Sequence, residues 1–419
     1  MENKAKKAKN VKLIYFIFIW HGAFLMFTRS MIDFNTVFPS LITNLIDSKI
    51  IFGSLYSIML GVPFIFNIIF SHYMQAYKYK KKFLLFGIYL RVIAFMGMSV
   101  FTYFFAKESP HLVIISFFFW VLLFSISGGF AGIAYSDIIG KLLESKDRGR
   151  LFAMKQFVSS VASFLGGVIV ARIFTPGNIS FPLNYAIILF IGGVGLFIAS
   201  LAFKFIEEPA SKIDEGFERR SLGVFIKSVP GILKKDSDFF RFIIVENMAS
   251  FSLMILPFYM VYAREIFKID GTYIGKYLIF QIIGTIVSNL LWGLIVNKFG
   301  SRQVVRICIL GGALIPILAI LLSPLGPDIF GIIFFFLGFL ISGRRVGFEP
   351  YLLDIAPEEK RTIYLGIRGT LNIFVIILPV LGGFFIDFFG FYFTFILVTV
   401  VMLVAFYLLR GKRGKGIKC

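Results

Sequence analysis

Long apolar stretches separated by short polar stretches dominate the chain. A helix needs about 20 apolar residues to cross the hydrocarbon of a bilayer, and stretches of about that length recur from end to end. Twelve spans are expected near residues 13–38, 50–73, 83–105, 111–137, 151–174, 184–206, 239–263, 271–296, 304–323, 329–353, 364–386 and 390–409. The pattern therefore predicts an all-α, polytopic membrane protein with twelve transmembrane helices.

Composition supports a membrane protein. Hydrophobic residues make up 58% of the 419 residues and charged residues only 16%, and the mean hydropathy is +0.87. Soluble domains are about 45–50% apolar. The first stretch, "MENKAKKAKNVKLIYFIFIW", is basic and then apolar like a secretory signal, but no small-residue cleavage site follows it. We therefore expect it to be retained as the first span.

The basic residues are distributed unevenly over the loops. The net charge is +20, but most Lys and Arg residues fall on one side of the expected membrane when the N-terminus is placed inside. Six lie outside (Lys49, Lys107, Arg172, Arg264, Lys268, Lys276) and four within spans (Arg29, Arg91, Arg344, Arg345). This asymmetry follows the positive-inside rule. It predicts both termini in the cytoplasm and an inner-membrane location, and it argues against a nucleic-acid partner.

The longest polar stretch, residues 207–238, has six expected spans on either side. Within it, apolar residues such as Phe217 and Phe225 alternate with basic residues such as Arg220 and Lys227. This pattern is typical of an amphipathic helix on the cytoplasmic leaflet, although a flexible linker fits equally well. The expected organisation is a bundle over 1–206, a linker over 207–238 and a second bundle over 239–419 that ends in a basic tail.

The two halves resemble each other in sequence. "ISGGFAGIAYSD" (126–137) in the fourth span answers "ISGRRVGFEPYLLD" (341–354) in the tenth. Downstream, Arg148 answers Arg361, Lys155 answers Arg368, and a Leu-Gly-Gly triplet at 165–167 answers another at 381–383. Three agreements in the same order favour an internal duplication.

The segment "WGLIVNKFGSRQ" (292–303) resembles the loop signature of the major facilitator superfamily, Gly-x3-Asp-Arg-x-Gly-Arg-Arg/Lys. The matching or similar residues are Gly293, Asn297, Lys298, Gly300 and Arg302. Asn297 replaces the usual Asp, and the first-half loop at 71–82 has lost nearly all of the signature. The resemblance implies two pseudo-symmetric six-helix bundles around a central cavity, and alternating access of that cavity to the two sides of the membrane.

Ionisable residues inside the spans cost roughly 2.5–3.5 kcal/mol each on insertion scales and usually mark function. They concentrate in the first, seventh and tenth spans, which the resemblance places around the cavity: His21, Arg29, Asp33, Glu246, Arg344, Arg345 and Glu349. Spacing of four residues predicts pairing of Arg29 with Asp33 and of Arg345 with Glu349. Glu246 is expected to pair with Arg344 or Arg345. These pairs either merely neutralise each other or bind solute and a coupling proton.

A polar stripe in the eighth span and charges in the loops complete the candidates. Tyr277 and Gln281 lie on one face with Thr285, Ser288 and Trp292, as a cavity wall or as interhelical packing contacts. Charged residues recur at the inner ends of the fourth and tenth spans and in the loops that follow. Asp137, Arg148, Asp354 and Arg361 are therefore candidate cytoplasmic gate residues, with ordinary solvated charges as the alternative.

These observations predict a secondary transporter that moves a small organic solute, coupled to protons carried by Asp33, Glu246 or Glu349. There is no Gly-x4-Gly-Lys-Ser/Thr loop for nucleotide hydrolysis. Intramembrane charges sum to +1, which favours an anionic or zwitterionic solute. A uniporter, an exporter of lipophilic compounds, a membrane enzyme and a non-transporting receptor remain alternatives. No cofactor or metal is expected, because the two cysteines and three histidines are scattered. A monomer is expected.

Overall fold

The computed structural model describes residues 2–74, 77–143, 145–210, 222–357 and 361–409. In these residues all regular secondary structure is helical. Ten helical segments are long and apolar enough to cross a membrane. The apolar part of α3, Lys49–Pro63, is shorter, and the segment Ile367–Leu409 contains a sharp turn at Gly390, where φ is 79°. The expectation of an all-helical polytopic membrane protein is confirmed, and twelve spans stays a prediction.

The chain divides into two compact units. Unit 1 comprises residues 1–48, 54–214 and 268–282. Its helices are α1 (Glu2–Met31), α2 (Val37–Leu45), most of α3 (Lys49–Met74), α4 (Lys81–Phe105), α5 (Pro110–Leu142), α6 (Ser145–Phe174), α7 (Leu183–Leu201), the 3-10 turn η1 (Ala202–Phe205) and the first part of α12 (Gly271–Phe299).

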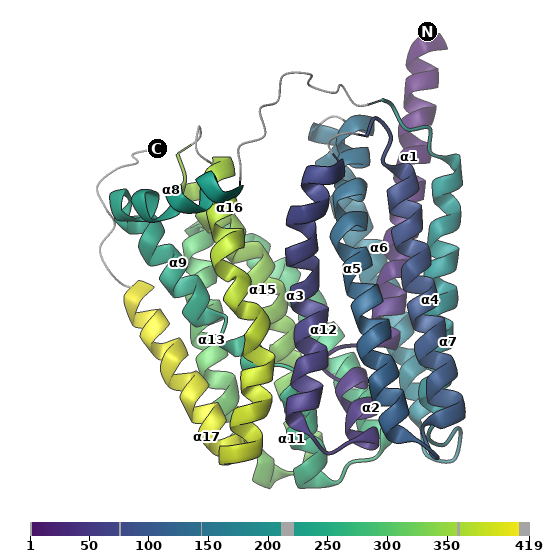
Figure 1. Cartoon of the computed structure of the whole chain (residues 1–419), viewed down its shortest axis with the longest axis vertical. Helices are drawn as coiled ribbons and strands as arrows, with labels where there is room; N and C mark the ends of the chain where they lie inside the picture. The colour runs from purple at the N-terminus through teal and green to yellow at the C-terminus, as the bar shows by residue number, and fades with distance from the viewer. Residues whose placement is uncertain (1, 75–76, 144, 211–221, 358–360, 410–419) are drawn as a thin grey trace. The chain divides into compact units, whose positions relative to one another are not determined.

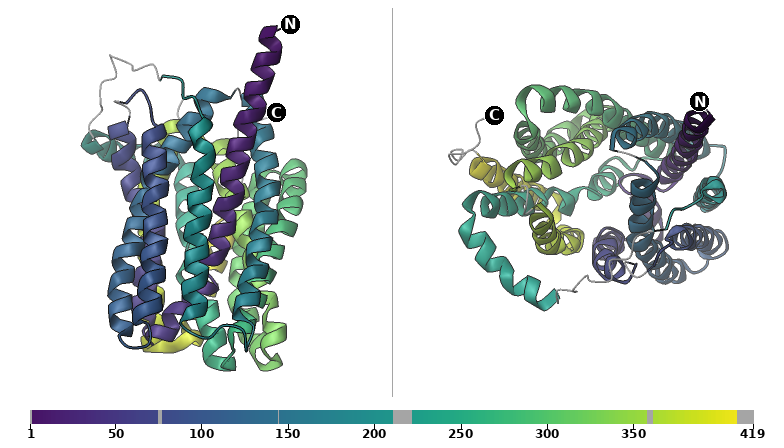
Figure 2. Two further views of the ribbon diagram at one scale, coloured as in Figure 1. Left: turned by 90° about the vertical axis from the view of Figure 1, so that its right-hand side faces the viewer. Right: turned by 90° about the horizontal axis from the view of Figure 1, so that it is seen from above.

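Within unit 1, α1 packs against α6 and α7, and α4 packs against α5 and α7. The long helices α4, α5 and α7 run side by side (Figure 1), and the view along the helix axes in Figure 2 shows them nearly end on. Apolar side chains from these helices, such as Phe18, Leu84, Ile139, Leu151 and Phe203, form a buried cluster.

Unit 2 comprises residues 49–53, 215–267 and 283–419. Besides the rest of α12, its helical elements are α8 (Leu222–Lys235), α9 (Ser237–Ala249), α10 (Ser252–Ile255), α11 (Phe258–Phe267), α13 (Ser301–Leu322), η2 (Ser323–Leu325), α14 (Pro327–Phe330), α15 (Ile332–Ile355), α16 (Arg361–Leu371), η4 (Asn372–Ile377) and α17 (Leu378–Leu409). Helix α13 packs against both α15 and α17 (Figure 1).

Two expected spans are not continuous helices. The first was expected over 13–38, but α1 ends at Met31 and α2 begins at Val37. Asp33 causes this break locally, because its Oδ1 accepts hydrogen bonds from Asn35 N (3.0 Å) and Thr36 Oγ1 (2.9 Å), which compete with the helical pattern. The seventh span, expected over 239–263, is divided into α9, α10 and α11. Pro257, which lacks a backbone N–H, lies at the second division.

Small residues allow close contact between helices in unit 2. A Cβ at Gly284 of α12 would lie 2.0 Å from the Phe335 carbonyl oxygen of α15, and one at Gly382 of α17 would lie 2.1 Å from the Met254 carbonyl oxygen. Such backbone approach is typical of membrane helices, where association depends on packing instead of burial from water. At these two positions any larger residue would push the helices apart.

Candidate functional site

Asp33 lies at the centre of a polar network in unit 1. Besides the two bonds that form its turn, its Oδ2 accepts a hydrogen bond from Gln281 Nε2 at 2.9 Å. Arg29 and Asp33 do not lie on one continuous helix, because α1 ends at Met31 between them, and their pairing stays a prediction. Arg29 is exposed on the last turn of α1, and its charge acts electrostatically on Asp33. The structure thus brings Gln281 to Asp33, an association that sequence spacing could not predict.

His21 is buried within unit 1, with 6% of its surface exposed. Its ring packs against Tyr135 (centroids 5.3 Å apart) and Phe203 (4.9 Å). Lys155 of α6 donates from Nζ to the Tyr135 hydroxyl at 2.8 Å. The sequence pointed to Lys155 only as the counterpart of Arg368, and Tyr135 only as part of the repeat. Their association with His21 therefore went unpredicted.

Arg91, to which the sequence assigned no role, reaches from α4 to α5. Its Nε donates to Ser127 Oγ at 3.1 Å, and its guanidinium lies 5.2 Å from the centroid of the Phe124 ring. A guanidinium over an aromatic face gains about 0.5–2 kcal/mol, more when desolvated. A Cβ at Gly128 would lie 2.8 Å from Arg91 Nη2, so glycine at that position provides the space.

Glu246 forms an ion pair in unit 2, but the predicted partner is wrong. Instead of Arg344 or Arg345, Arg368 of α16 donates to it, from Nη2 at 2.6 Å and from Nε at 2.9 and 3.0 Å. The Glu246 side chain is 3% exposed. The predicted pairing of Arg345 with Glu349 is also absent from the described residues. Glu349, 64% exposed, has Arg368 Nη1 at 3.7 Å, so Arg368 serves both acids.

Arg344 stabilises the break between α9 and α10. It donates from Nη1 to the Ala249 carbonyl oxygen at 2.8 Å and from Nη2 to Ser250 Oγ at 3.0 Å. The last carbonyl groups of a helix have no partner within it, and Arg344 supplies one here. Arg345, the next residue of α15, is exposed. The two adjacent arginines therefore have different environments.

Some members of the polar stripe on α12 make packing contacts, and one contacts the candidate site. Thr285 Oγ1 donates to the Gly338 carbonyl oxygen (3.2 Å), and Trp292 Nε1 donates to the Phe339 carbonyl oxygen (3.1 Å). Ser288 donates back to the Thr285 carbonyl oxygen of the same helix. These three contacts fit the packing interpretation. Tyr277 is fully buried, and Gln281, through Asp33, is the member of the stripe that joins a candidate site.

The candidate gate residue Asp137 has two basic partners. It binds Lys80 Nζ and Lys141 Nζ, each at 2.7 Å. Lys141 also binds Glu208 at 2.7 Å, and Glu208 accepts from the backbone N–H groups of Lys80 (2.8 Å) and Lys81 (2.7 Å). This set of Lys80, Asp137, Lys141 and Glu208 is named the ion cluster below.

In the second half, Asp354 accepts a hydrogen bond from Ser301 Oγ, and the side chain of Arg361 lies outside the described residues. Arg148 is half-buried and its Nε has no hydrogen-bond partner in the part of the chain that the structure describes. Asp137 and Asp354 lie near the ends of α5 and α15, as expected. The role of these residues as a cytoplasmic gate stays a prediction.

The signature-like loop joins α12 to α13. Gly300 has φ of 80°, a conformation that favours glycine, and its N–H bonds to the Val296 carbonyl oxygen at 2.9 Å. Arg302 Nη2 donates to the Leu409 carbonyl oxygen at the end of α17 (2.6 Å). Asn297 and Lys298 are exposed, and a Cβ at Gly293 would meet nothing within 4 Å. Gly300 thus forms the turn between α12 and α13, and Arg302 links this turn to the end of α17.

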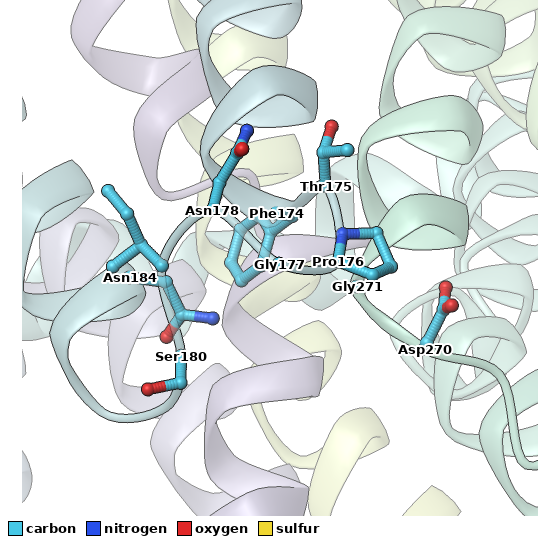
Figure 3. Close-up of a pocket in the computed structure, with 10 residues that line it drawn as sticks. Phe174, Thr175, Pro176, Gly177, Asn178, Ser180, Asn184, Asp270 and Gly271 are labelled. Atoms are coloured by element: carbon cyan, nitrogen blue, oxygen red, sulfur yellow. The ribbon is translucent and has the colours of Figure 1, made fainter.

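A polar pocket of about 410 Å³ lies in unit 1 where α6, α7 and α12 meet at their connecting segments. Thr175, Asn178, Ser180, Asn184 and Asp270 line it (Figure 3). The Asn178 and Asp270 side chains already bond to the backbone of Arg172 and Thr272, respectively. Among the described residues no group of His, Cys, Asp and Glu could hold a metal ion.

Comparisons with known proteins agree with this architecture. The C-terminal residues 242–417 match the family model described as Major Facilitator Superfamily. No curated protein has a significantly similar sequence.

Solved structures extend the likeness to nearly the whole chain. The fold resembles a D-xylose–proton symporter (TM-score 0.69, 15% identity, covering 96% of this chain and 97% of the symporter). It also resembles the nucleoside transporter NupG (0.67, 13%, 96% and 98%) and a POT family transporter crystallised with a thioalcohol-conjugated peptide (0.66, 13%, 95% and 95%). At this identity the likeness shows the fold. Together with the family match over residues 242–417, it makes the chain similar to Major Facilitator Superfamily transporters and supports a multi-pass membrane protein.

Proposed function

We propose that this protein is a secondary active transporter that moves a small organic solute across the cytoplasmic membrane, coupled to protons. Two six-helix bundles, over residues 1–206 and 239–419, would expose a central site alternately to the two sides of the membrane. The linker over 207–238, which includes α8, would lie with both termini in the cytoplasm. Each polypeptide would act as a monomer.

The observation that carries proton coupling is the buried pair of Glu246 and Arg368. Charge-assisted bonds of this kind are roughly twice as strong as bonds between neutral groups. Binding of a proton to Glu246 would remove the charge that holds Arg368 and let Arg368 move to Glu349, which already lies 3.7 Å from it. A single proton would thereby exchange one ion pair for another between α9, α15 and α16. Such an exchange can link protonation to helix movement.

Asp33 is the second candidate proton carrier, in unit 1. Its bonds to Thr36 and Gln281 connect the break after α1 with α12. Solute contacts would come from residues near this break: Arg29, Tyr277 and Gln281. His21, Arg344 and Arg345 complete the proposed set.

The ion cluster is proposed as the inner gate of the first half, with Asp354 in the second. The adjoining loops would support the gate. Their proposed residues are Arg148, Arg361, Gly293, Asn297, Lys298, Gly300 and Arg302. Opening would require the four charges of the ion cluster to separate or to move together as one body.

The solved structures named above support a small organic solute, since they are a D-xylose–proton symporter, a nucleoside transporter and a POT family transporter in complex with a conjugated peptide. The test begins with a ligand-induced thermal-shift screen of the purified protein, followed by uptake of the hit into proteoliposomes. An inward-directed proton gradient should drive accumulation in the wild type.

We expect Glu246→Gln to abolish pH-driven accumulation while retaining solute exchange, and Asp33→Asn and Glu349→Gln to reduce it. Glu108→Gln, an exposed acid in the loop between α4 and α5, is the matched control and should behave as wild type. Proton coupling through these acids would be wrong if all three variants accumulated solute normally.

A further inference from the structure

Lys155 lies among neutral side chains in unit 1. Its Nζ bonds to the Tyr135 hydroxyl (2.8 Å) and lies over the rings of Tyr135 (4.7 Å to the centroid) and Phe152 (5.6 Å). Arg91 likewise contacts a hydroxyl and a ring. Neither cation has an ion-pair partner among the described residues, and both act electrostatically on His21. This part of the unit therefore carries two cations that no acid in the described part of the chain neutralises.

Two buried polar atoms beside Lys155 also lack hydrogen bonds. His21 Nδ1 and Ser159 Oγ have no partner in the described structure, in side chains that are 6% and 4% exposed. Leaving such a group unsatisfied costs about 1–3 kcal/mol. Gly22 brings the groups together, since a Cβ there would lie 2.7 Å from Lys155 Cγ and 3.0 Å from Ser159 Oγ. Lys155 thus packs with Ser159 against Gly22, and it shares the Tyr135 side chain as a neighbour with His21.

The second half shows how the fold neutralises a cation at this place. Arg368, the counterpart of Lys155 in the repeat, binds Glu246 of α9, the first long helix of its half. In the first half the helix that faces Lys155 is α1, and at the contact it presents Gly22 instead of an acid. Among the described residues, Lys155 therefore has no acid that corresponds to Glu246 in the second half.

We propose that the counter-charge is an oxyanion of the transported solute, a carboxylate or a phosphate, bound by Lys155, Ser159 and His21, with Arg91 contributing its field. An ammonium and a hydroxyl donate charge-assisted hydrogen bonds to such a group, and His21 can donate in its Nδ1–H tautomer. The inference rests on the proposed transport function, because it identifies the class of solute.

Thermal unfolding of the full-length protein in detergent, with matched probes, tests the proposal. The pairs are glycerol 3-phosphate against glycerol and lactate against lactamide, with choline as the cationic probe. We expect at least one anion to raise the unfolding temperature and its uncharged partner and choline to leave it unchanged. Binding of that anion should weaken roughly ten-fold or more in Lys155→Gln, as expected for a charged hydrogen bond, and Lys155→Arg should retain it. The exposed Lys107→Gln is the matched control.

Each outcome decides the proposal. The proposal would be overturned if the uncharged probes or choline stabilised the protein instead of the anions, or if neither anion stabilised it. It would also be overturned if a folded Lys155→Gln protein bound the anion as tightly as the wild type. Failure of transport is a separate result. An anion that binds through Lys155 but is not accumulated in proteoliposomes would contradict the proposed function and leave the binding site standing. Accumulation of an uncharged solute would support the proposed transport function and contradict the anion-binding site.

Discussion

At the scale of single residues, charge inside this protein is neutralised by partners that spacing along a helix does not reveal. Glu246 binds Arg368, 122 positions away, and Asp33 binds Gln281, 248 positions away. Helical neighbours such as Arg345 and Glu349 do not pair among the described residues. The sequence identifies the ionisable residues inside the spans, but their partners depend on which helices pack together.

Removing one member of the buried pair should destabilise the protein more than removing both. Glu246→Gln or Arg368→Gln alone leaves a buried charge without compensation, at a cost of roughly 3–5 kcal/mol in comparable pairs. We expect the double variant to recover much of that loss. Thermal unfolding of the four proteins gives the coupling energy, and strictly additive losses would show that the two side chains do not interact.

Glu208 and Glu207 are adjacent acids with different environments. The Glu208 carboxylate is 3% exposed and accepts the backbone N–H groups of Lys80 and Lys81 at the start of α4, whereas Glu207 is exposed. Glu208→Gln should lower the free energy of unfolding by about 1–3 kcal/mol. The amide would accept weaker hydrogen bonds from the backbone N–H groups of Lys80 and Lys81, and the ion pair with Lys141 would be lost. Glu207→Gln is the control. Equal unfolding temperatures for the two variants would contradict this role of Glu208.

At the scale of elements, hydropathy located the helices well and their interruptions poorly. The divisions after Met31 and after Ala249 both occur within apolar runs. They arise from side chains that bind the backbone, Asp33 locally and Arg344 from α15. A hydropathy average over a sequence window does not detect such sites, because a hydrogen bond from another helix does not change the local composition.

Two glycines of α12 should respond oppositely to alanine. At Gly284 the added Cβ would meet the Phe335 backbone at 2.0 Å, and at Gly293 it would meet nothing within 4 Å. We expect Gly284→Ala to destabilise by about 1–3 kcal/mol through overpacking. Gly293→Ala should be neutral or stabilising by up to about 1 kcal/mol, because alanine favours helix. Thermal unfolding measures both, and a tolerated Gly284→Ala would mean that α12 and α15 do not approach closely.

At the scale of the whole molecule, the twelve-span topology with both ends in the cytoplasm is testable with the native cysteines. Cys308 is buried in α13, so Cys419 should be the residue that reacts with a membrane-impermeant maleimide. We expect labelling only after cells are permeabilised, and none in Cys419→Ser. In a Cys419→Ser background, Asn178→Cys, in the loop between α6 and α7, should label in intact cells. Labelling of Cys419 in intact cells would contradict an even number of spans.

The sequence by itself determined the class of this protein: apolar runs of membrane-crossing length and a repeated pattern specify a polytopic helical membrane protein, and the asymmetric distribution of basic loops predicts its orientation. It also marked the ionisable residues inside the membrane, since any such residue stands out against apolar neighbours. Only the tertiary structure decided that Arg368 neutralises Glu246, that Lys80 and Lys141 bind Asp137, and that Lys155 and His21 both contact Tyr135. The physical reason is that hydropathy and helix propensity act along the chain, whereas charge compensation acts through space, between helices whose packing no single segment encodes.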